Sequence, residues 1–181
     1  MRSRLRILFT LLGLGVFSVS ASAIPVRWTL TGVTFSDGGT ASGSFIYDAD
    51  TNTYSNISIT TTAGSVLLTG ATYGFIASVV PPSSTGFLTT QQNGGNLTGT
   101  RGMAPFFGTA LTNAGGSVSV SAVEASCSDA VCTSPVPPTR GTTAGTVTGA
   151  QVAFIPTLSF PMLALLGLAL AAAALSLIRR R

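Results

Sequence analysis

The chain contains few residues that could carry out catalysis. It has five acidic residues, two cysteines and no histidine, which excludes a Ser-His-Asp triad and a histidine-based zinc site. Glycoside hydrolysis needs two carboxylates flanking one bond. Asp48 and Asp50 fall in a predicted turn, and Glu124 and Asp129 flank the cysteine pair, so structural or solvated roles are favoured. We therefore predict no catalytic residue and no cofactor, and a carboxylate hydrolase is the weakest alternative.

One acidic cluster resembles part of a calcium-binding loop. Asp48, Asp50 and Asn52 occupy positions 1, 3 and 5 of that pattern. Thr53 then stands where the loop needs glycine, and Ile59 stands where it needs a bidentate glutamate. Asp and Asn also favour tight turns because their side chains accept hydrogen bonds from nearby backbone. The segment is predicted to be a hairpin turn, and no metal site is expected.

The two cysteines, Cys127 and Cys132, are separated by four residues. A redox motif would need the Cys-x-x-Cys spacing at the start of a helix, and a zinc site would need further ligands nearby. In an oxidising compartment the pair is predicted to form a local disulfide. This bridge would close the loop that follows a predicted strand at 116–125.

The body of the chain, residues 24–154, has the composition of a β-sheet protein. Valine, isoleucine, threonine and aromatic residues recur between glycine-, proline- and asparagine-rich turns, and no segment shows a 3.6-residue apolar stripe. Trp28 alternates with polar neighbours as a core residue does, and a sugar-stacking platform is the alternative. These patterns predict a single antiparallel β-sandwich-like domain. Strands are expected at 26–30, 44–47, 54–59, 65–69, 72–80, 86–90, 116–125 and 145–154, and a loop at 134–143.

The N-terminal segment has the pattern of a secretory signal peptide. Three arginines precede an apolar stretch at 7–19. Ala21 and Ala23 then form a small-x-small cleavage pattern before Ile24. Residues 1–23 are therefore predicted to be a signal peptide read by Sec-type export machinery.

The C-terminal segment has the pattern of a membrane anchor. Residues 160–178 are an uncharged apolar run, followed by Arg179, Arg180 and Arg181. At about 1.5 Å per residue, such a helix nearly matches a hydrocarbon core of about 30 Å. A transmembrane helix is predicted, with the arginines as a basic anchor in the cytoplasm. The body would then lie on the far side of the inner membrane, in the periplasm.

The positive net charge of the whole chain does not describe the predicted exported body. The sequence pI is about 9.8, but six of the nine arginines lie in the two terminal segments. The predicted exported body keeps three arginines against five acidic residues, a net charge of −2. A nucleic-acid partner is excluded because the body has no basic patch for phosphate contacts.

A five-residue motif, Ile155, Pro156, Thr157, Leu158 and Ser159, stands directly before the apolar run and the arginine cluster. This three-part tail resembles the PEP-CTERM sorting domains of Gram-negative bacteria that make exopolysaccharide, and in particular their Ile-Pro-Thr-Leu variant. The resemblance implies a membrane-bound precursor that an exosortase-like processing enzyme cleaves near the motif.

A second, shorter resemblance lies in the body. The segment 35–51 is similar to the opening of many exported proteins that carry such tails. This similarity implies a β-rich extracellular domain and no particular activity.

Together these observations predict a signal peptide at 1–23, an exported β-rich domain at 24–154 and a C-terminal sorting domain at 155–181. The favoured function is a non-enzymatic surface or extracellular-matrix protein associated with exopolysaccharide. One alternative is a lectin-like carbohydrate-binding module that uses a sheet face or the turn at 48–52. Another is an unprocessed single-pass inner-membrane protein.

Overall fold

The computed structural model describes residues 24–79, 81, 83–152, 164–168, 170, 175, 178 and 179. The chain divides into two compact units, Met1–Gln151 and Val152–Arg181. The strands described below all lie in the first unit. In the second unit, the described residues 164–168, 170, 175 and 178 are helical and exposed.

The described residues of the first unit form one nine-stranded sheet in which every neighbouring pair is antiparallel. The strand order is β4-β3-β2-β1-β9-β8-β7-β6-β5, and a 3-10 helix, η1 (Ser83–Thr85), precedes β6. The all-β, antiparallel prediction is confirmed, although the strands form one continuous sheet and not the two separate sheets of a sandwich. The strands are β1 (Val26–Phe35), β2 (Thr40–Asp48), β3 (Thr53–Thr61), β4 (Ala71–Tyr73), β5 (Phe75–Val79), β6 (Phe87–Thr90), β7 (Arg101–Phe107), β8 (Gly116–Cys127) and β9 (Pro135–Gln151).

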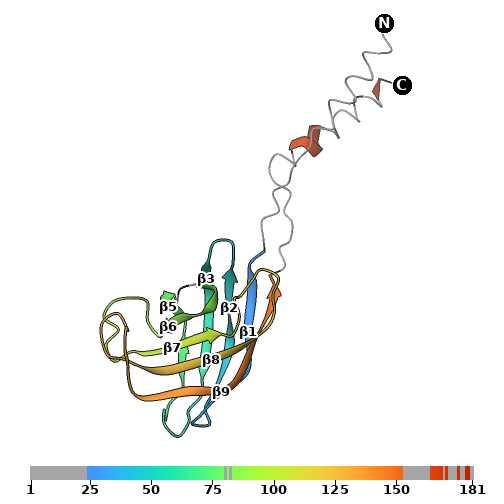
Figure 1. The fold of residues 1–181 in the computed structure, drawn as a ribbon. Helices are drawn as coiled ribbons and strands as arrows, with labels where there is room; N and C mark the ends of the chain where they lie inside the picture. The colour runs from blue at the N-terminus through green and yellow to red at the C-terminus, as the bar shows by residue number, and fades with distance from the viewer. Residues whose placement is uncertain are drawn as a thin grey trace. The chain divides into compact units, whose positions relative to one another are not determined.

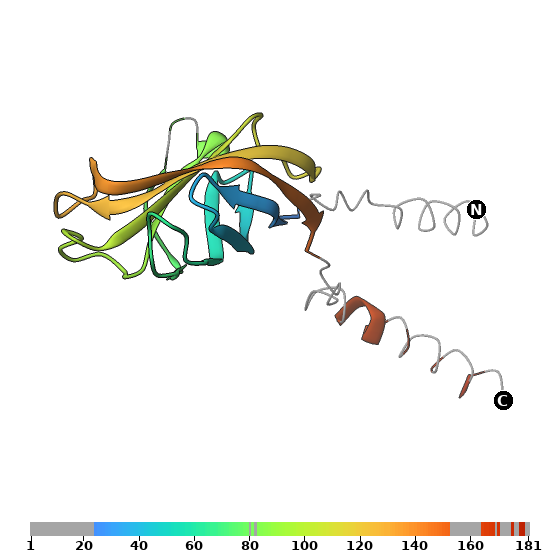
Figure 2. The same ribbon diagram turned by 90° about the horizontal axis from the view of Figure 1, so that it is seen from below.

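The sheet curls until its two edges are consecutive in the chain. The edge strands β4 and β5 are separated only by Gly74, so one extended segment pairs first with β3 and then with β6. The Gly74 N–H donates to the carbonyl of Thr90, which holds this switch against β6. Figures 1 and 2 show that β8 and β9 run across the direction of β2 and β3, on the other side of the core.

Side-chain alternation explains why the sheet curls around an apolar interior. In β1, Val26, Trp28 and Leu30 are buried, and the intervening Arg27 and Thr29 are exposed. Successive side chains of a strand point to opposite faces, so this alternation puts one apolar face inward and one polar face outward.

The interior is filled largely by aromatic side chains. The ring of Phe45 in β2 lies 5.1 Å from that of Phe87 in β6 and 5.6 Å from that of Phe107 in β7. Tyr54 of β3 also contacts Phe87, with ring centroids 4.6 Å apart. Because these contacts join strands from distant positions in the sheet order, the rings hold the two sides of the curled sheet together.

Two sequence-based predictions of local structure were wrong. Residues 134–143 were expected to be a loop, but β9 begins at Pro135. Proline lacks an N–H, but Pro135 is the first residue of the strand, and Pro137 and Pro138 lie where the pairing of β9 with β8 shifts register, so few ladder hydrogen bonds are lost. Residues 65–69 were expected to be a strand, but the backbone N–H groups of Val66 and Leu67 donate to the Asp37 carboxylate instead of a neighbouring strand.

Most of the predicted membrane span at 160–178 lies outside the described residues, as does the predicted signal peptide at 1–23. Among the residues that are described, no helix combines the length and the apolar character needed to cross a membrane.

The inward and outward faces of β7 give a matched test of the fold. Phe107 is 6% exposed within the aromatic core, and its neighbour Phe106 is 39% exposed on the outer face. Phe107→Ala should lower the free energy of unfolding by about 3–5 kcal/mol because it opens a cavity. Phe106→Ala should cost about 1 kcal/mol or less. Equal losses for the two variants in urea denaturation would contradict the assignment of faces.

Candidate functional site

The most unusual group of side chains is a buried charged cluster at one end of the sheet. The side chains of Arg140 in β9, Glu124 in β8 and Asp37 in the β1–β2 turn have no solvent exposure. Arg140 donates from Nε and Nη2 to Glu124 Oε2, at 2.9 and 2.7 Å, and from Nη1 to both Asp37 oxygens at 3.2 Å. Its Nη2 also donates to the carbonyl of Thr62 at 2.8 Å. The whole guanidinium group is therefore saturated with acceptors.

The other oxygen of Glu124 connects this cluster to three more strands. Tyr73 of β4 donates its hydroxyl to Glu124 Oε1 at 2.6 Å, and Thr61 of β3 donates to the same oxygen at 3.1 Å. Arg101 of β7 lies 3.5 Å from it and also donates to the carbonyl of Thr69. Asp37, Thr61, Tyr73, Arg101, Glu124 and Arg140 are called the Arg140 cluster below.

Two glycines make room for the Arg140 cluster. A Cβ atom at Gly39 would lie 2.1 Å from Arg140 Nη1, and one at Gly64 would lie 2.3 Å from the Asp37 carboxylate. The Gly39 N–H also donates to Asp37 at 3.0 Å. These glycines permit the close approach of backbone to charge.

The electrostatics of the cluster favour a structural role. Burial alone would raise the pKa of Asp37, but the N–H groups of Leu67 and Gly39 and the Arg140 guanidinium outweigh it, so the pKa is lowered. Burial and the adjacent Glu124 carboxylate raise the pKa of Tyr73, which keeps its hydroxyl a neutral donor. Both buried carboxylates are already engaged by Arg140, so neither is positioned to contact a substrate.

The turn at 48–52 connects β2 to β3, as predicted. Asp48 accepts hydrogen bonds from the Asp50 N–H at 3.0 Å and the Thr51 hydroxyl at 2.9 Å, and these donors lower its pKa. Tyr47 donates to the Asn52 side chain, which tethers the turn to the core. Within the described residues, no group of three or more His, Cys, Asp or Glu side chains is placed to hold a metal ion.

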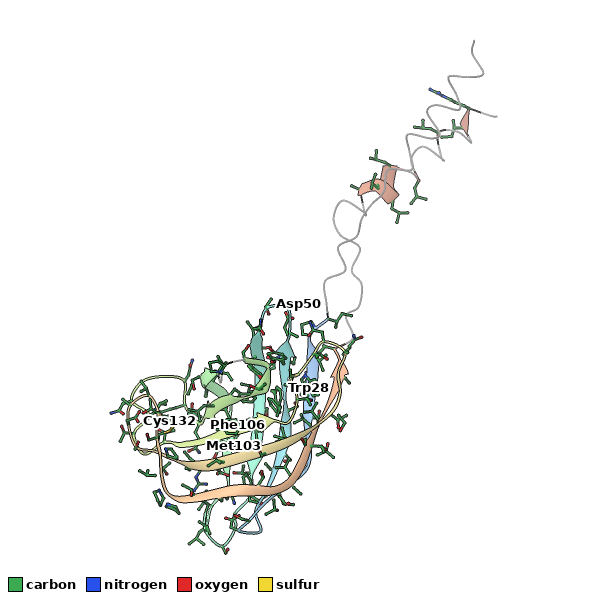
Figure 3. All side chains as sticks on the ribbon, in the orientation of Figure 1. Trp28, Asp50, Met103, Phe106 and Cys132 are labelled. Carbon is green, nitrogen blue, oxygen red and sulfur yellow. A yellow bond between two sulfur atoms is a disulfide. The ribbon has the colours of Figure 1, made fainter. Side chains whose placement is uncertain are left out.

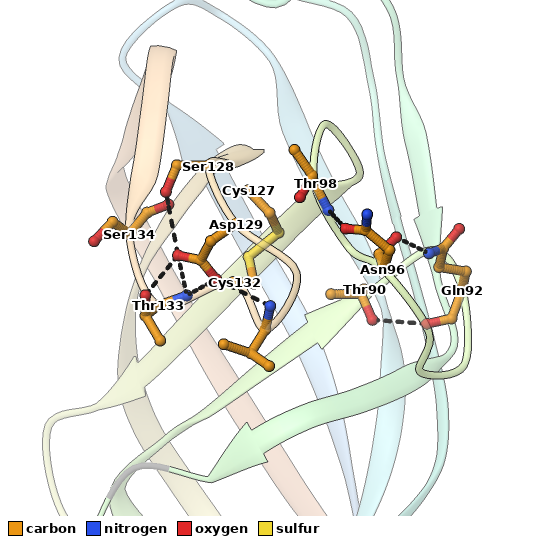
Figure 4. Close-up of a disulfide and its surroundings, with 11 residues drawn as sticks. Thr90, Gln92, Asn96, Thr98, Cys127, Ser128, Asp129, Cys132, Thr133 and Ser134 are labelled. Carbon is orange, nitrogen blue, oxygen red and sulfur yellow. Dashed lines mark hydrogen bonds between the residues drawn. A yellow bond between two sulfur atoms is a disulfide. The ribbon is translucent and has the colours of Figure 1, made fainter.

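The predicted disulfide is present and links Cys127, the last residue of β8, to Cys132 in the loop that joins β8 to β9. Figure 4 shows Asp129 inside this loop, where it accepts hydrogen bonds from the Val131 N–H and from the N–H and hydroxyl of Thr133. These donors lower the pKa of Asp129 to about 2. By the chain-entropy estimate, closing so short a loop contributes about 2 kcal/mol to stability.

An apolar groove lies beside the disulfide on the outer face of β6, β7 and β8. Its volume is about 300 Å³, and its walls include Leu88, Phe106, Val123 and Cys132. Figure 3 labels two of these residues, Phe106 and Cys132. Such a groove can hold a small apolar group.

The structure places the remaining predicted site residues as follows. Trp28 is fully buried in the core, so it is not a surface platform for a sugar ring. Arg179 is exposed. The other predicted targeting residues, Ala21, Ala23, Ile155, Pro156, Thr157, Leu158, Ser159, Arg180 and Arg181, lie outside the described residues.

Sequence reasoning missed the Arg140 cluster, although a signal for part of it was present. Val120 and Ala122 are buried, and Glu124 continues the same alternation in β8. A carboxylate on the core face of a strand needs a buried cation. Arg140 could not be identified as this cation because it follows a proline-rich segment that resembles a loop.

Comparison with known proteins gives no relative from which a function could be transferred. No protein-family profile, curated protein or solved structure matches the chain.

Removing the central cation should be strongly destabilising. Arg140→Met keeps much of the side-chain volume but leaves Asp37 and Glu124 buried without their partner. We expect a loss of about 3–5 kcal/mol in the free energy of unfolding, measured by urea denaturation. Arg27→Met is the matched control because Arg27 is exposed, and it should change stability by about 0.5 kcal/mol or less.

The triple variant Asp37→Asn/Glu124→Gln/Arg140→Met tests whether the instability of Arg140→Met comes from unpaired charges or from the changed shape of the side chain. It removes all three buried charges, so most of the loss seen in Arg140→Met should be recovered. A triple variant as unstable as Arg140→Met would show that the cost does not come from unpaired carboxylates.

The lowered pKa values of Asp37, Asp48 and Asp129 predict acid sensitivity. Their folded-state pKa lies below the ordinary value of 3.8, so as the pH falls the unfolded chain binds protons first. The stabilisation is complete above about pH 5 and is lost between about pH 4 and pH 2. Urea midpoints should follow this course, and Asp37→Asn should lower the midpoint at neutral pH and flatten its acid decline. If the urea midpoint of Asp37→Asn declined as steeply in acid as that of the wild-type chain, Asp37 would be excluded as a source of the acid sensitivity.

Proposed function

We propose that the protein is a non-enzymatic surface or extracellular-matrix protein that is exported and then sorted by its C-terminal tail. The observation that carries this proposal is the Cys127–Cys132 disulfide. Disulfides form and persist in oxidising compartments and are rare in the cytosol. The bridge therefore supports the export that the predicted signal peptide at 1–23 implies.

The use of the acidic side chains supports a structural role. Asp37 and Glu124 are paired with Arg140 inside the domain, and Asp48 and Asp129 accept hydrogen bonds within two turns. These four carboxylates stabilise the domain itself. This arrangement favours a stable extracellular scaffold over a hydrolase.

The proposal includes the path to the surface. Sec-type machinery exports the chain, the apolar run at 160–178 holds it in the inner membrane with the body in the periplasm, and an exosortase-like enzyme reads the motif at 155–159. The mature β domain then lies at the cell surface or in the exopolysaccharide matrix. Without processing, the same chain is a single-pass inner-membrane protein.

The test is intact-mass measurement of the full chain after fractionation of an exopolysaccharide-producing Gram-negative host. We expect a released form that begins at Ile24, lacks Arg179 to Arg181 and is two hydrogens lighter than the reduced chain. Pro156→Ala/Thr157→Ala should hold the chain in the membrane, and Pro81→Ala/Thr98→Ala is a control outside the motif. A wild-type chain that keeps its arginines in the inner membrane would exclude sorting by the tail.

A further inference from the structure

The outer face of the sheet carries a continuous row of hydroxyl side chains across five neighbouring strands. Ser117 of β8 is opposite Thr148 of β9, and Thr148 is opposite Thr29 of β1. Thr29 is in turn opposite Ser44 of β2, which is opposite Ser58 of β3. This first hydroxyl row follows from the register of the strands.

A second hydroxyl row runs beside the first. Ser119 of β8 is opposite Thr146 of β9, which is opposite Thr31 of β1. The register between β1 and β2 shifts after Leu30, and the row continues from Ser42 of β2 to Thr60 of β3 and Thr72 of β4. Neighbouring strands lie about 4.8 Å apart and alternate residues about 6.7 Å apart, so the rows form a two-dimensional array.

The hydroxyl groups of this array are accessible to a ligand. Nine of its eleven residues are exposed, and Ser44 and Thr146 are half-buried. Within the described part of the chain, the hydroxyls of Thr29 and Thr148 have no hydrogen-bond partner. Thr60 and Thr72 hydrogen-bond to each other, and Thr146 donates to the Thr31 carbonyl. A hydroxyl group can both donate and accept, so the array still presents donors and acceptors to a ligand.

The array is uncharged, which restricts the chemistry of its partner. Its charged neighbour is Arg27, which donates to Ser44 at 3.3 Å. Nucleic acids and acidic polymers need several cations. The cores of protein interfaces are rich in aromatic residues and depleted in serine, and the exposed Phe106 and the apolar groove lie elsewhere, on β6 to β8. A neutral, hydroxyl-rich polymer is the complementary partner.

We propose that the two hydroxyl rows bind a neutral polysaccharide. This inference rests on the proposed matrix function and assigns a surface and a ligand class to it. Each hydrogen bond replaces one to water and contributes little, so binding depends on many contacts along a polymer. The array follows the twist and curl of the sheet, which suits a flexible, hydrated chain better than a flat crystal face.

The test is co-sedimentation of the purified full chain with insoluble polysaccharides, in a detergent without a sugar headgroup. Amorphous cellulose and curdlan are the neutral probes, and a polygalacturonate gel is the charged probe. Because the chain is purified first, the result does not depend on export or tail processing. Failure of sorting and failure of binding are therefore distinguished.

The decisive variant is Thr29→Val/Thr148→Val, which removes two adjacent hydroxyls and keeps side-chain shape and strand propensity. Thr109→Val/Thr139→Val is the matched control, because these exposed threonines lie outside the array. The wild-type chain and the control should bind a neutral probe, and the array variant should bind about tenfold more weakly with an unchanged thermal midpoint.

Several results would overturn the proposal. Binding of the wild-type chain to neither neutral probe would exclude it, and so would stronger binding to polygalacturonate that salt abolishes. Unchanged or tighter binding by the array variant would show that the hydroxyls are not the contact groups. A change of oligomeric state in that variant would show that the array contacts a second copy of the chain and not a polysaccharide.

Discussion

Arg140 carries a guanidinium group inside the sheet, where an unpaired charge is unfavourable by several kcal/mol. All of its donor nitrogens must therefore find acceptors, and the chain supplies them from three separate places. Glu124 approaches from the neighbouring strand β8, Asp37 from the turn between β1 and β2, and the Thr62 carbonyl from the residue that follows β3. The relative positions of these segments are fixed together because the contacts with Glu124 and Asp37 are buried and the contact with Thr62 is partly buried. The rest of the first unit is arranged around this constraint.

The same constraint explains how the sheet closes. Asp37 accepts hydrogen bonds from Val66 and Leu67, so that segment crosses the end of the sheet without becoming a strand. The chain then enters β4, where Tyr73 reaches Glu124, and switches at Gly74 to pair with β6. With these charges used inside, the outer face of β8, β9, β1, β2 and β3 is rich in hydroxyl groups and carries Arg27 as a charged residue. The interior thus determines the chemistry that the surface can offer.

Local features could be predicted from the sequence, and the features that join distant segments could not. The Asp48 turn and the Cys127–Cys132 bridge each depend on a few consecutive residues, and their patterns are visible in the chain. Glu124 and Arg140 are sixteen residues apart in sequence and meet only because β8 and β9 pair. The alternation of buried and exposed residues along β8 could have placed Glu124 on the core face. It gives no information about which cation pairs with Glu124. The strand register that aligns the hydroxyl rows likewise exists only in the folded sheet.

The most direct test of this account is exchange of the guanidinium hydrogens with solvent, measured by ¹⁵N-resolved NMR of the full chain in detergent. Arg140 should show resolved Nε–H and Nη–H signals that exchange far more slowly than those of Arg27, because Arg140 is buried and saturated with acceptors and Arg27 is exposed. Arg27 in the same sample is the internal reference. Equally rapid exchange for both arginines would mean that Arg140 is open to water, and the buried ion-pair cluster would be refuted.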